Sequence, residues 1–451
     1  MGKNAANNNA SIVDAVILAG GRGTRLAARS KGLPKPLVEI GGKALLEYQL
    51  ELLARYNVRG ATLLCGFGAA AIREFCADGA RWGLRLRCID EPAPLGTAGA
   101  VIAAIDELPE EFFVLYGDTM VNVDLARFYA AHAASGAEAT LFLHPNDHPW
   151  DSDLVETGEN GRIVAIHGYP HPEGAALPNQ VNAALYILKA RALRGRSWPA
   201  GPLDFAKDVF PRLLAQGVHL NGYRSPEYVK DAGTPERLGR VEADLRNGTI
   251  ARSNLSFTRP AVFLDRDGTI NEEAGYVTRP EQLKLIAGAA EAIKLLRASG
   301  YRVVVITNQP VVARGECTEA DVQRVHDRLE TLLGGEGAFL DGIYACLHHP
   351  DRGFPGERPE LKFDCDCRKP KGGLLRRAES ELNLDLEGSW LIGDRTADLQ
   401  TAQNCGVRSV LLRTGAGGRD GRYPARPDYT FDDLLEAARF IAAQHATGEA
   451  Q

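Results

Sequence analysis

Short apolar runs typical of buried strands alternate with longer segments of helical periodicity, and this alternation restricts the fold more than any other feature of the chain. In the first half, the strand-like runs cover residues 15–20, 61–67, 112–118 and 139–144, and the helical segments cover 45–56, 123–135, 204–215 and 235–246. Weaker strand signals between 153 and 190 predict a mixed sheet edge. Because parallel strands need a crossover long enough for a helix, the pattern predicts an α/β fold with a mainly parallel sheet flanked by helices.

The same kind of pattern begins again after a polar stretch without clear periodicity, residues 247–259, which we interpret as a linker. Beyond it, the predicted strands cover 260–265, 301–308, 342–349, 389–394 and 407–412, and the predicted helices cover 287–299, 318–333, 372–383 and 396–405. The two halves share no repeat. We therefore predict two unrelated α/β domains, at residues 11–246 and 260–442, followed by a tail that frays beyond about Ala442.

The composition argues against several classes of protein. Of the 451 residues, 45% are hydrophobic, which is enough for ordered cores, yet no run reaches the roughly 18–20 apolar residues of a membrane span. The net charge of −6, without any long basic tract, argues against a protein of nucleic acids or anionic membranes. We recognise no secretory signal, and five of the eight cysteines are scattered on apolar segments, so we expect reduced thiols and a cytoplasmic location.

A glycine-rich loop follows the first predicted strand, with the sequence LAGGRGTRLAARSKGLPKPL at residues 18–37. Glycines let backbone N–H groups approach an anion closely, and neighbouring cations add fixed positive charge. The spacing matches neither the dinucleotide-binding G-x-G-x-x-G motif nor the P-loop. The residues expected around a bound phosphate are Gly20, Gly21, Gly23, Arg22, Arg25 and Lys35.

Four segments in the same order resemble those of the sugar-1-phosphate nucleotidyltransferases. They are GGRGTRL with PKPL, EPAPLGTAGAV at 91–101, LYGDTMVNVDL at 115–125 and VKDAGTPE at 229–236. The resemblance implies a Rossmann-like domain with nucleotide contacts at Gly20, Gly21, Gly23, Thr24, Gly96 and Thr97. It also implies that Asp118 and Asp231 bind Mg²⁺ while Arg25 and Lys35 stabilise the triphosphate and the leaving pyrophosphate.

The same resemblance assigns a sugar side to this domain. Glu156 matches the family glutamate that binds sugar hydroxyls, and Asn182 and Lys207 also fit family motifs, although Lys207 equally fits a solvated helix position. One departure stands out, because many relatives carry Glu-Lys-Pro after this strand and use the lysine to hold the sugar phosphate. This chain has IHGYPHP at 166–172 instead, so the identity of the sugar stays open.

The second half opens with FLDRDGTIN at 263–271, which places Asp265 and Asp267 directly after a predicted strand. Two carboxylates so placed can act as a nucleophile and an acid/base in phosphate chemistry with Mg²⁺. With the later Thr307, Lys369 and Asp394, the segment resembles the haloacid dehalogenase phosphatase superfamily. The resemblance implies that Asp265 is the nucleophile, Thr307 and Lys369 bind the phosphoryl group, and Mg²⁺ is held by Asp265, Asp267 and Asp394.

Two short segments, CLHH at 346–349 and CDCRKPKGG at 365–373, supply sulfur and nitrogen ligands. Cys346, His348, Cys365 and Cys367 form a set suited to a closed tetrahedral Zn²⁺ site, with His349 as the competing imidazole. The polar loop between these segments has little apolar material, so the metal would order it. The spacing is not that of a zinc finger, so nucleic-acid binding does not follow.

The zinc loop followed by CRKPKGG resembles D-glycero-D-manno-heptose 1,7-bisphosphate phosphatases and the related histidinol phosphatases. On that resemblance the substrate contacts would be Gly275, Tyr276, Asn308, Gln309, Arg368 and Arg395. Ala274, Pro310 and Val311 depart from the heptose-type pattern. The fusion favours the heptose enzymes, because removal of the 7-phosphate would yield a sugar 1-phosphate that the first domain can use.

The leading hypothesis is therefore a bifunctional enzyme of nucleotide-sugar biosynthesis, acting on sugar phosphates and a nucleoside triphosphate, with GMP transfer favoured from the logic of the heptose route. One alternative keeps both activities but changes the sugar or the nucleotide. Another makes one domain catalytically idle and regulatory, prompted by the missing lysine. The cofactors expected are Mg²⁺ in both domains and a structural Zn²⁺ in the second, and a homo-oligomer is possible for the first family.

Overall fold

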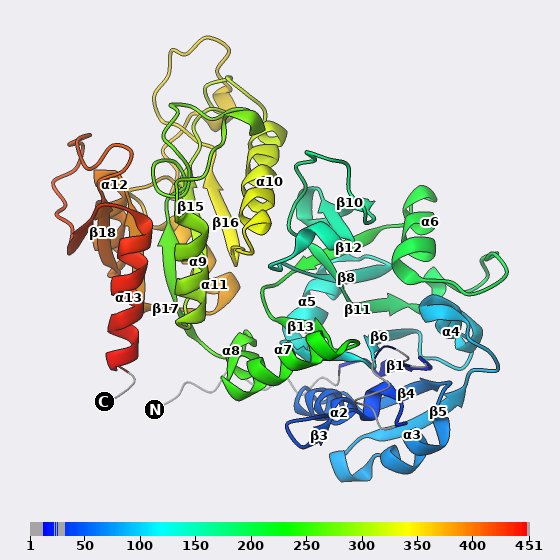
Figure 1. Cartoon of the computed structure of the whole chain (residues 1–451). Helices are drawn as coiled ribbons and strands as arrows, with labels where there is room; N and C mark the ends of the chain where they lie inside the picture. The colour runs from blue at the N-terminus through cyan, green and yellow to red at the C-terminus, as the bar shows by residue number, and fades with distance from the viewer. Residues whose placement is uncertain (1–11, 22, 24, 26–31, 449–451) are drawn as a thin grey trace. The chain divides into compact units, whose positions relative to one another are not determined.

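The computed structural model describes residues 12–21, 23, 25 and 32–448 (Figure 1). The chain divides into two compact units. The first unit contains the residues up to 144 together with 155–168 and 182–254, and the second contains 145–154, 169–181 and the residues from 255 onward. The sequence did not predict that two segments of the first half belong to the second unit.

Nine of the described strands form one sheet in the order β10–β9–β11–β6–β1–β4–β5, with β8 paired to β11 and β12 paired to β8. Their bounds are β1 Ala15–Ala19, β4 Gly60–Cys65, β5 Arg85–Asp90, β6 Glu111–Tyr116, β8 Ala139–His144, β9 Leu154–Thr157, β10 Ile163–His167, β11 Val181–Lys189 and β12 Leu220–Arg224. Strand β1 is parallel to β4 and β6, whereas β11 runs antiparallel to β6. The predicted mixed edge is therefore confirmed.

Helices cover both faces of this sheet because alternate residues of its strands are apolar on both sides. Their bounds are α2 Leu45–Arg55, α3 Ala69–Cys76, α4 Gly96–Ala104, α5 Leu125–Ser135, α6 Phe210–Ala215 and α7 Pro235–Arg246. In β1, Ile17 packs into a core with residues of α2, α3 and α5, and Val16 packs into another with residues of α4 and α6. Strands β7 (Thr119–Asn122) and β13 (Tyr228–Asp231) form a separate two-stranded antiparallel sheet.

The second unit contains a parallel sheet of six described strands in the order β16–β15–β14–β17–β18–β19. Their bounds are β14 Arg259–Leu264, β15 Arg302–Asn308, β16 Gly342–Cys346, β17 Leu384–Gly393, β18 Arg408–Leu412 and β19 Tyr429–Phe431. The helices are α9 Ala289–Ala298, α10 Glu319–Gly335, α11 Gly373–Leu382, α12 Thr396–Cys405 and α13 Leu434–Gly448. Val262 and Leu264 pack against α9, α10 and α13, and Ala261 and Phe263 pack against α11 and α12.

Helix α10 contacts the two segments of the first half of the sequence that belong to the second unit, residues 145–154 and 169–181. The Asn179 N–H donates to Oε2 of Glu330 at 2.9 Å, and the Leu177 N–H donates to the Thr331 hydroxyl at 3.2 Å. The ring of Pro149 lies against Gly334 so closely that a Cβ there would approach it to 2.5 Å. These contacts explain why residues 145–154 and 169–181 cluster with the second unit.

Two boundary predictions need correction. The predicted linker contains a helix, α8 (Thr249–Ser253), because Ile250 enters an apolar cluster with Val38, Met120 and Leu238, and this burial stabilises a short turn that has no clear periodicity. The tail does not fray at Ala442, because α13 continues to Gly448, with Ala437 and Ile441 buried against the sheet.

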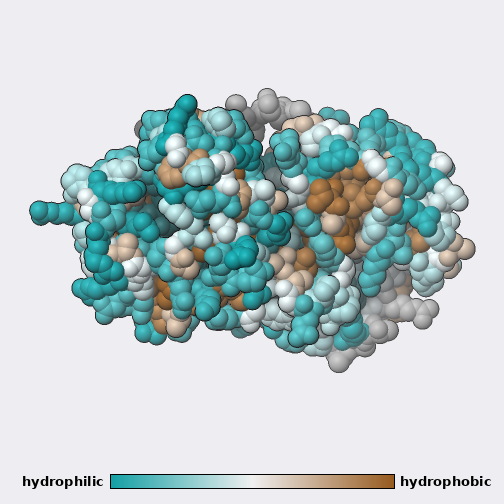
Figure 2. All heavy atoms as spheres, turned by 90° about the horizontal axis from the view of Figure 1, so that it is seen from above, coloured by the Kyte–Doolittle hydropathy of each residue, from teal (hydrophilic) through white to brown (hydrophobic). Residues whose placement is uncertain are grey.

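The face of the molecule shown in Figure 2 is mostly hydrophilic, with hydrophobic side chains gathered in a hollow over part of it. Exposed large hydrophobic residues elsewhere are scattered along the chain. Among the residues that the structure describes, no helix is long and apolar enough to cross a membrane.

Stability of the second unit should depend on a buried carboxylate, Asp341. It accepts hydrogen bonds from Arg297, from Nη1 of Arg302 at 3.0 Å and from the Val303 N–H at 2.7 Å. Burial alone would raise the pKa of Asp341, but the two guanidinium groups exceed that effect and lower it to about 2. The ionised form is therefore favoured by folding, and its contribution is present above about pH 4 and lost as the pH falls towards 2.

We expect Asp341→Asn to lower the free energy of unfolding by about 3–5 kcal/mol at pH 7, because two arginines lose a buried partner. Guanidinium-induced unfolding at several pH values measures this, and between pH 4 and 2 the variant should lose less stability than the wild type. Asp432→Asn is the matched control, since Asp432 is 72% exposed in its ion pair with Arg413. Equal stability of Asp341→Asn and the control would contradict the assignment.

Candidate active sites

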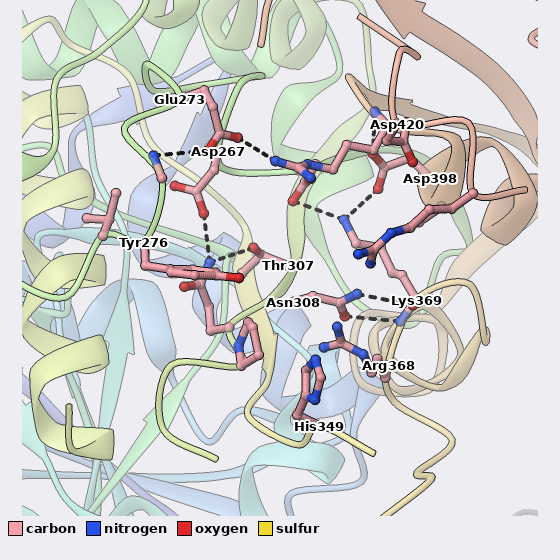
Figure 3. Close-up of a pocket in the computed structure, with 18 of the residues that line it drawn as sticks. Asp267, Glu273, Tyr276, Thr307, Asn308, His349, Arg368, Lys369, Asp398 and Asp420 are labelled. Carbon is pink, nitrogen blue, oxygen red and sulfur yellow. Dashed lines mark hydrogen bonds and ion pairs between the residues drawn. The ribbon is translucent and has the colours of Figure 1, made fainter. Parts of the chain in front are cut away.

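The carboxyl ends of three neighbouring parallel strands place polar side chains at one edge of the second sheet. Asp265 follows β14, Thr307 is near the end of β15, and Asp394 follows β17. Since carboxyl ends of parallel strands meet at the same edge, these groups lie close together, and Asp265 and Thr307 line a cavity of about 580 Å³ with Lys369 and Asp398. Figure 3 shows Thr307, Lys369 and Asp398 in that cavity. A cavity of this volume can hold a complete phosphorylated sugar.

A buried lysine joins two of the carboxylates in this cavity. Nζ of Lys369 lies 2.9 Å from Oδ1 of Asp265 and 2.6 Å from Oδ1 of Asp398, and it also donates to the Ile306 carbonyl at 3.0 Å. Burial alone would lower the pKa of Lys369, but the charges of Asp265 and Asp398 outweigh burial and raise it. The lysine therefore stays cationic beside the predicted nucleophile, where it can also neutralise a phosphoryl group.

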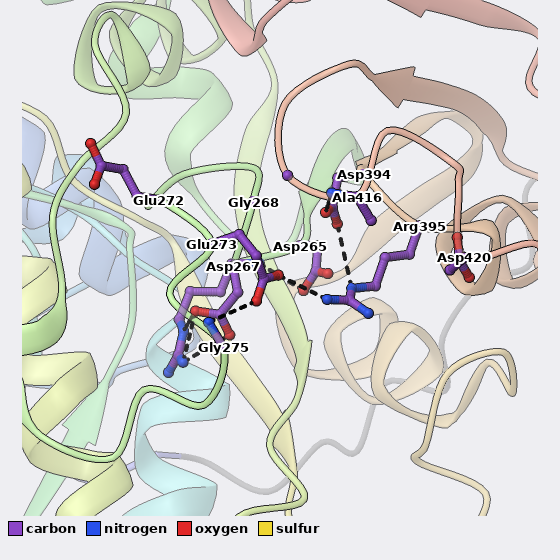
Figure 4. Close-up of polar contacts among 12 residues, drawn as sticks. Asp265, Asp267, Gly268, Glu272, Glu273, Gly275, Asp394, Arg395, Ala416 and Asp420 are labelled. Carbon is purple, nitrogen blue, oxygen red and sulfur yellow. Dashed lines mark hydrogen bonds and ion pairs between the residues drawn. The ribbon is translucent and has the colours of Figure 1, made fainter.

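A divalent cation fits the group formed by Asp265, Asp394 and Asp398, whose carboxylate oxygens all lie within 4.8 Å of one another and are buried. Oδ1 of Asp394 is buried without a hydrogen-bond partner, and Oδ2 accepts from the Ala416 N–H at 2.6 Å (Figure 4). Burial, followed by the charge of Asp265, raises the pKa of Asp394 to about 7. One ammonium does not balance three buried carboxylates, and hard oxygen ligands suit Mg²⁺.

The carboxylate of Asp267, a residue predicted to bind Mg²⁺, is held by other side chains, and its metal role stays a prediction. That carboxylate accepts hydrogen bonds from the buried Arg266, from Nδ2 of Asn271 at 2.9 Å and from Nε2 of Gln309 at 2.8 Å. Burial would raise its pKa, but the Arg266 charge and these hydrogen bonds lower it. The Asp267 side chain is thus held apart from the buried carboxylate group, with Asp398 in its place, but still lines the cavity where an acid/base is needed.

The four predicted sulfur and nitrogen ligands come together. Sγ of Cys346 lies 3.5 Å from Sγ of Cys365 and 3.2 Å from Sγ of Cys367, and Nδ1 of His348 lies 3.1 Å from Sγ of Cys367. All four ligand atoms lie within 4.8 Å of one another. Three thiols and one imidazole gathered this closely form the donor set that Zn²⁺ prefers.

Residues next to the four sulfur and nitrogen ligands also line one side of the cavity. His349, the competing imidazole, points away from the sulfur cluster to Arg314, whose Nη2 lies 3.3 Å from its Nε2. The Arg314 guanidinium lies over the ring of Tyr276, 4.6 Å from its centroid, and Arg368 donates to the His348 carbonyl at 3.2 Å. Tyr276 and Arg368 were predicted from sequence as substrate contacts, whereas Arg314 was not, although it lies in the NQPVVARG segment.

The remaining predicted substrate contacts also line the cavity. They are Gly275, Asn308, Gln309 and Arg395. Asn308 is fixed by two contacts with the Lys369 backbone, at 3.0 and 3.1 Å, and Arg395 is paired with Glu273 at 2.8 Å. The sequence analysis did not predict Glu273, Asp420, Arg422 or Tyr423 as lining residues.

In the first unit, a cavity of about 250 Å³ lies where β1 and β6 end. Its lining includes the predicted residues Gly20, Gly21, Lys35, Gly96, Thr97 and Asp118. Gly96 has a φ of +76°, and a Cβ there would lie 2.4 Å from the Leu203 carbonyl oxygen, so this helix start requires glycine. The Thr97 hydroxyl donates to Oδ2 of Asp204 at 2.9 Å. Glu91 and Tyr116 also line this cavity and were not predicted.

The two predicted metal carboxylates of the first unit lie on paired segments. Asp231 is opposite Thr119 in the β7–β13 ladder, and the Ala232 N–H donates to the Asp118 carbonyl at 2.9 Å. Nζ of Lys35 contacts Oδ2 of Asp118 at 2.7 Å, and a Cβ at Gly233 would lie 3.3 Å from Nζ. Asp118 and Asp231 therefore lie on neighbouring backbone segments near Lys35. The Asp231 carboxylate accepts hydrogen bonds from the Gly233 N–H at 2.6 Å and from Arg237.

The predicted sugar contacts are less closely grouped. Oε2 of Glu156 lies 3.0 Å from Nε2 of His167, and both side chains are partly exposed on β9 and β10. Asn182, on β11, uses its side chain to accept from the Ala184 N–H at 3.3 Å, and Lys207 is exposed on a turn of π-helix. Arg25 is exposed, while Arg22 and Thr24 lie outside the described residues.

Comparison with known proteins divides the chain in the same way. Residues 14–248 match the family described as Nucleotidyl transferase, and residues 366–437 match the family described as HAD-hydrolase-like. A D-glycero-beta-D-manno-heptose-1,7-bisphosphate 7-phosphatase of Yersinia pestis is 38% identical over 189 residues, which cover 41% of this chain and 97% of that protein. The Escherichia coli K12 protein of the same name is 42% identical over 158 residues, 35% of this chain and 80% of that protein.

Among solved structures, HddC from Yersinia pseudotuberculosis is 25% identical, with a TM-score of 0.45, covering 52% of this chain and all of that chain.

The sulfur cluster should hold a metal ion that orders the loop between its two segments. We expect the double variant Cys365→Ser, Cys367→Ser to lose about one equivalent of bound zinc per chain, since two of four ligands are removed. Elemental analysis of the purified protein measures this loss, and limited proteolysis should then cleave within 350–364. Cys405→Ser is the matched control, because Cys405 is buried outside the cluster. Unchanged zinc content in the double variant would refute the ligand assignment.

Proposed function

Because this chain belongs to the nucleotidyl transferase family over residues 14–248 and to the heptose-1,7-bisphosphate 7-phosphatase family over its second half, we propose that one polypeptide catalyses two consecutive steps. The second unit removes the 7-phosphate of D-glycero-D-manno-heptose 1,7-bisphosphate. The first unit then transfers a nucleotidyl group, GMP in the favoured case, to the heptose 1-phosphate and releases pyrophosphate. The observation that carries this proposal is the pairing of both site geometries in one chain.

In the phosphatase step, an Asp265 carboxylate oxygen attacks the phosphorus of the 7-phosphate, and the bond from phosphorus to the sugar oxygen breaks. Asp267 gives a proton to the departing oxygen, which requires that binding of the phosphate dianion offsets the effect of Arg266 and raises the pKa of Asp267. Water then hydrolyses the aspartyl phosphate with Asp267 as the base. Lys369 and the Thr307 hydroxyl bind the phosphoryl oxygens. Mg²⁺ held by Asp265 and Asp394 would supply further neutralisation of phosphoryl charge.

In the transfer step, a 1-phosphate oxygen of the sugar attacks the α-phosphorus of the nucleoside triphosphate, and the bond to the β-phosphate oxygen breaks. Positioning and charge neutralisation supply most of the catalysis in such reactions. The glycine loop and the start of α4 line the nucleotide cavity, and Lys35 is placed to neutralise the triphosphate. Asp118 and Asp231 would hold Mg²⁺, which would neutralise charge on the triphosphate.

The C1 configuration of the sugar and the nucleobase are open within this proposal. The phosphatase relatives are named for the β anomer of the bisphosphate. The first unit resembles guanylyltransferases whose route leads to the α anomer of the nucleotide-sugar. The C1 configuration and the nucleobase are therefore what the test must determine. A second candidate, in which the first unit is idle, is less favoured because Lys35 contacts Asp118 and Asp231 lies on the neighbouring backbone segment.

The test incubates the protein with Mg²⁺, each anomer of heptose 1,7-bisphosphate, and GTP, ATP, UTP or CTP separately. We expect the products to be phosphate, pyrophosphate and a GDP-heptose. Mass spectrometry detects each of them. Asp265→Asn should lower phosphate release by at least about 10³-fold, because it removes the nucleophile, and leave transfer to purified heptose 1-phosphate intact. Asp118→Asn should lower transfer by about 10²-fold or more and leave phosphate release intact.

Asp106→Asn and Asp432→Asn are matched controls, one in each unit, and should retain both activities because both carboxylates are largely exposed. Phosphate release without any nucleotide-sugar under all four triphosphates would support the idle first unit. Loss of both activities in either active-site variant would contradict two independent sites.

A further inference from the structure

The turn between β18 and β19, residues 413–428, is bonded to the catalytic edge at several points. The Ala416 N–H donates to Oδ2 of Asp394 at 2.6 Å, and the Gly418 N–H donates to the Asp394 carbonyl at 2.8 Å. The Thr414 hydroxyl donates to the Gly268 carbonyl at 2.6 Å. The position of this turn is thus determined by the same segments that carry the reacting carboxylates.

Asp420 fixes the far part of the turn. Its two carboxylate oxygens accept from the N–H and the hydroxyl of Thr396, at 2.9 and 2.6 Å, at the first residue of α12. The Thr396 hydroxyl in turn accepts from the N–H groups of Arg422 and Tyr423, both at 3.2 Å. A carboxylate at a helix start is favourable electrostatically, so the arrangement is stable. It holds Arg422 and Tyr423 in the lining of the cavity.

The other cations of the cavity are already engaged. Lys369 pairs with Asp265 and Asp398, and Arg395 pairs with Glu273. Arg368 donates to a backbone carbonyl, and Arg314 lies against aromatic rings and His349. Among the described residues, no hydrogen bond or ion pair engages the guanidinium of Arg422.

We infer that Arg422, with Tyr423 beside it, binds the phosphate that the phosphatase does not remove. This inference rests on the proposed function, in which the sugar carries two phosphates. One phosphate must reach Asp265, so the other lies a sugar's length away, within the same cavity. Within the described part of the chain, the Arg422 guanidinium makes no hydrogen bond or ion pair, unlike those of Arg314, Arg368 and Arg395, so it can meet a phosphate dianion with all its donors. The bonds of Asp420 and Thr396 hold its backbone in place before substrate arrives.

The test compares heptose 1,7-bisphosphate, in each anomer, with heptose 7-phosphate, which lacks the second phosphate. The measured quantity is the ratio of kcat/KM for the bisphosphate to kcat/KM for the monophosphate. Arg422→Ala should lower this ratio about tenfold, mainly through the KM of the bisphosphate, because only that substrate loses a charged contact. Arg422→Lys should restore part of the ratio, and Asp420→Asn should lower it in the same direction by loosening the turn.

Arg426→Ala is the matched control, since Arg426 is an exposed arginine of the same turn outside the cavity lining, and its ratio should equal that of the wild type. A ratio unchanged in Arg422→Ala, or an equal loss with both substrates, would overturn the inference. Failure of the wild type to hydrolyse the bisphosphate would instead overturn the proposed function. Circular dichroism of each variant confirms that the comparison is made between folded proteins.

Discussion

The contact of the Lys369 ammonium with two buried carboxylates is the interaction on which the phosphatase site depends. Without it, Asp265 and Asp398 would be two buried carboxylates with no opposite charge in contact with them. The lysine places a positive charge beside the attacking Asp265 oxygen and presents the same charge to the arriving phosphoryl group. Its placement needs the CRKPKGG segment to be ordered, and Cys367 and Cys365, two and four residues before Lys369, belong to the sulfur cluster that we expect to provide that order.

Much of the fold could be predicted because apolar periodicity records burial directly. The strands β1, β6, β14 and β15 and the helices α2, α10 and α12 lie within one or two residues of their predicted bounds. Helices α3 and α4 were missed, since α4 is apolar on all sides and has no face for periodicity to reveal. Helix α8 was missed because tertiary burial, rather than its own sequence, stabilises it.

The candidate sites were predictable where a residue type and its position after a strand determine the chemistry, as for Asp265, Asp394 and the four metal ligands. The orientation of Asp267 was not, because it depends on the buried Arg266 and on Gln309, which is distant in sequence. Asp420 and Arg422 were also beyond reach, since they lie in a turn without periodicity and act through Thr396. Contacts between side chains that are distant in sequence cannot be predicted from the local pattern of residue types.

The grouping of residues 145–154 and 169–181 with the second unit has a consequence for evolution and for protein engineering. The chain passes between the units five times, after residues 144, 154, 168, 181 and 254. The two units are therefore not two consecutive stretches of sequence joined by one linker. A fragment starting at 255 would expose Glu330, now only 3% exposed, and leave Thr331 without Leu177. Gene fission at the apparent linker would thus produce two products that each lack part of their surface, which favours inheritance of the pair as one gene.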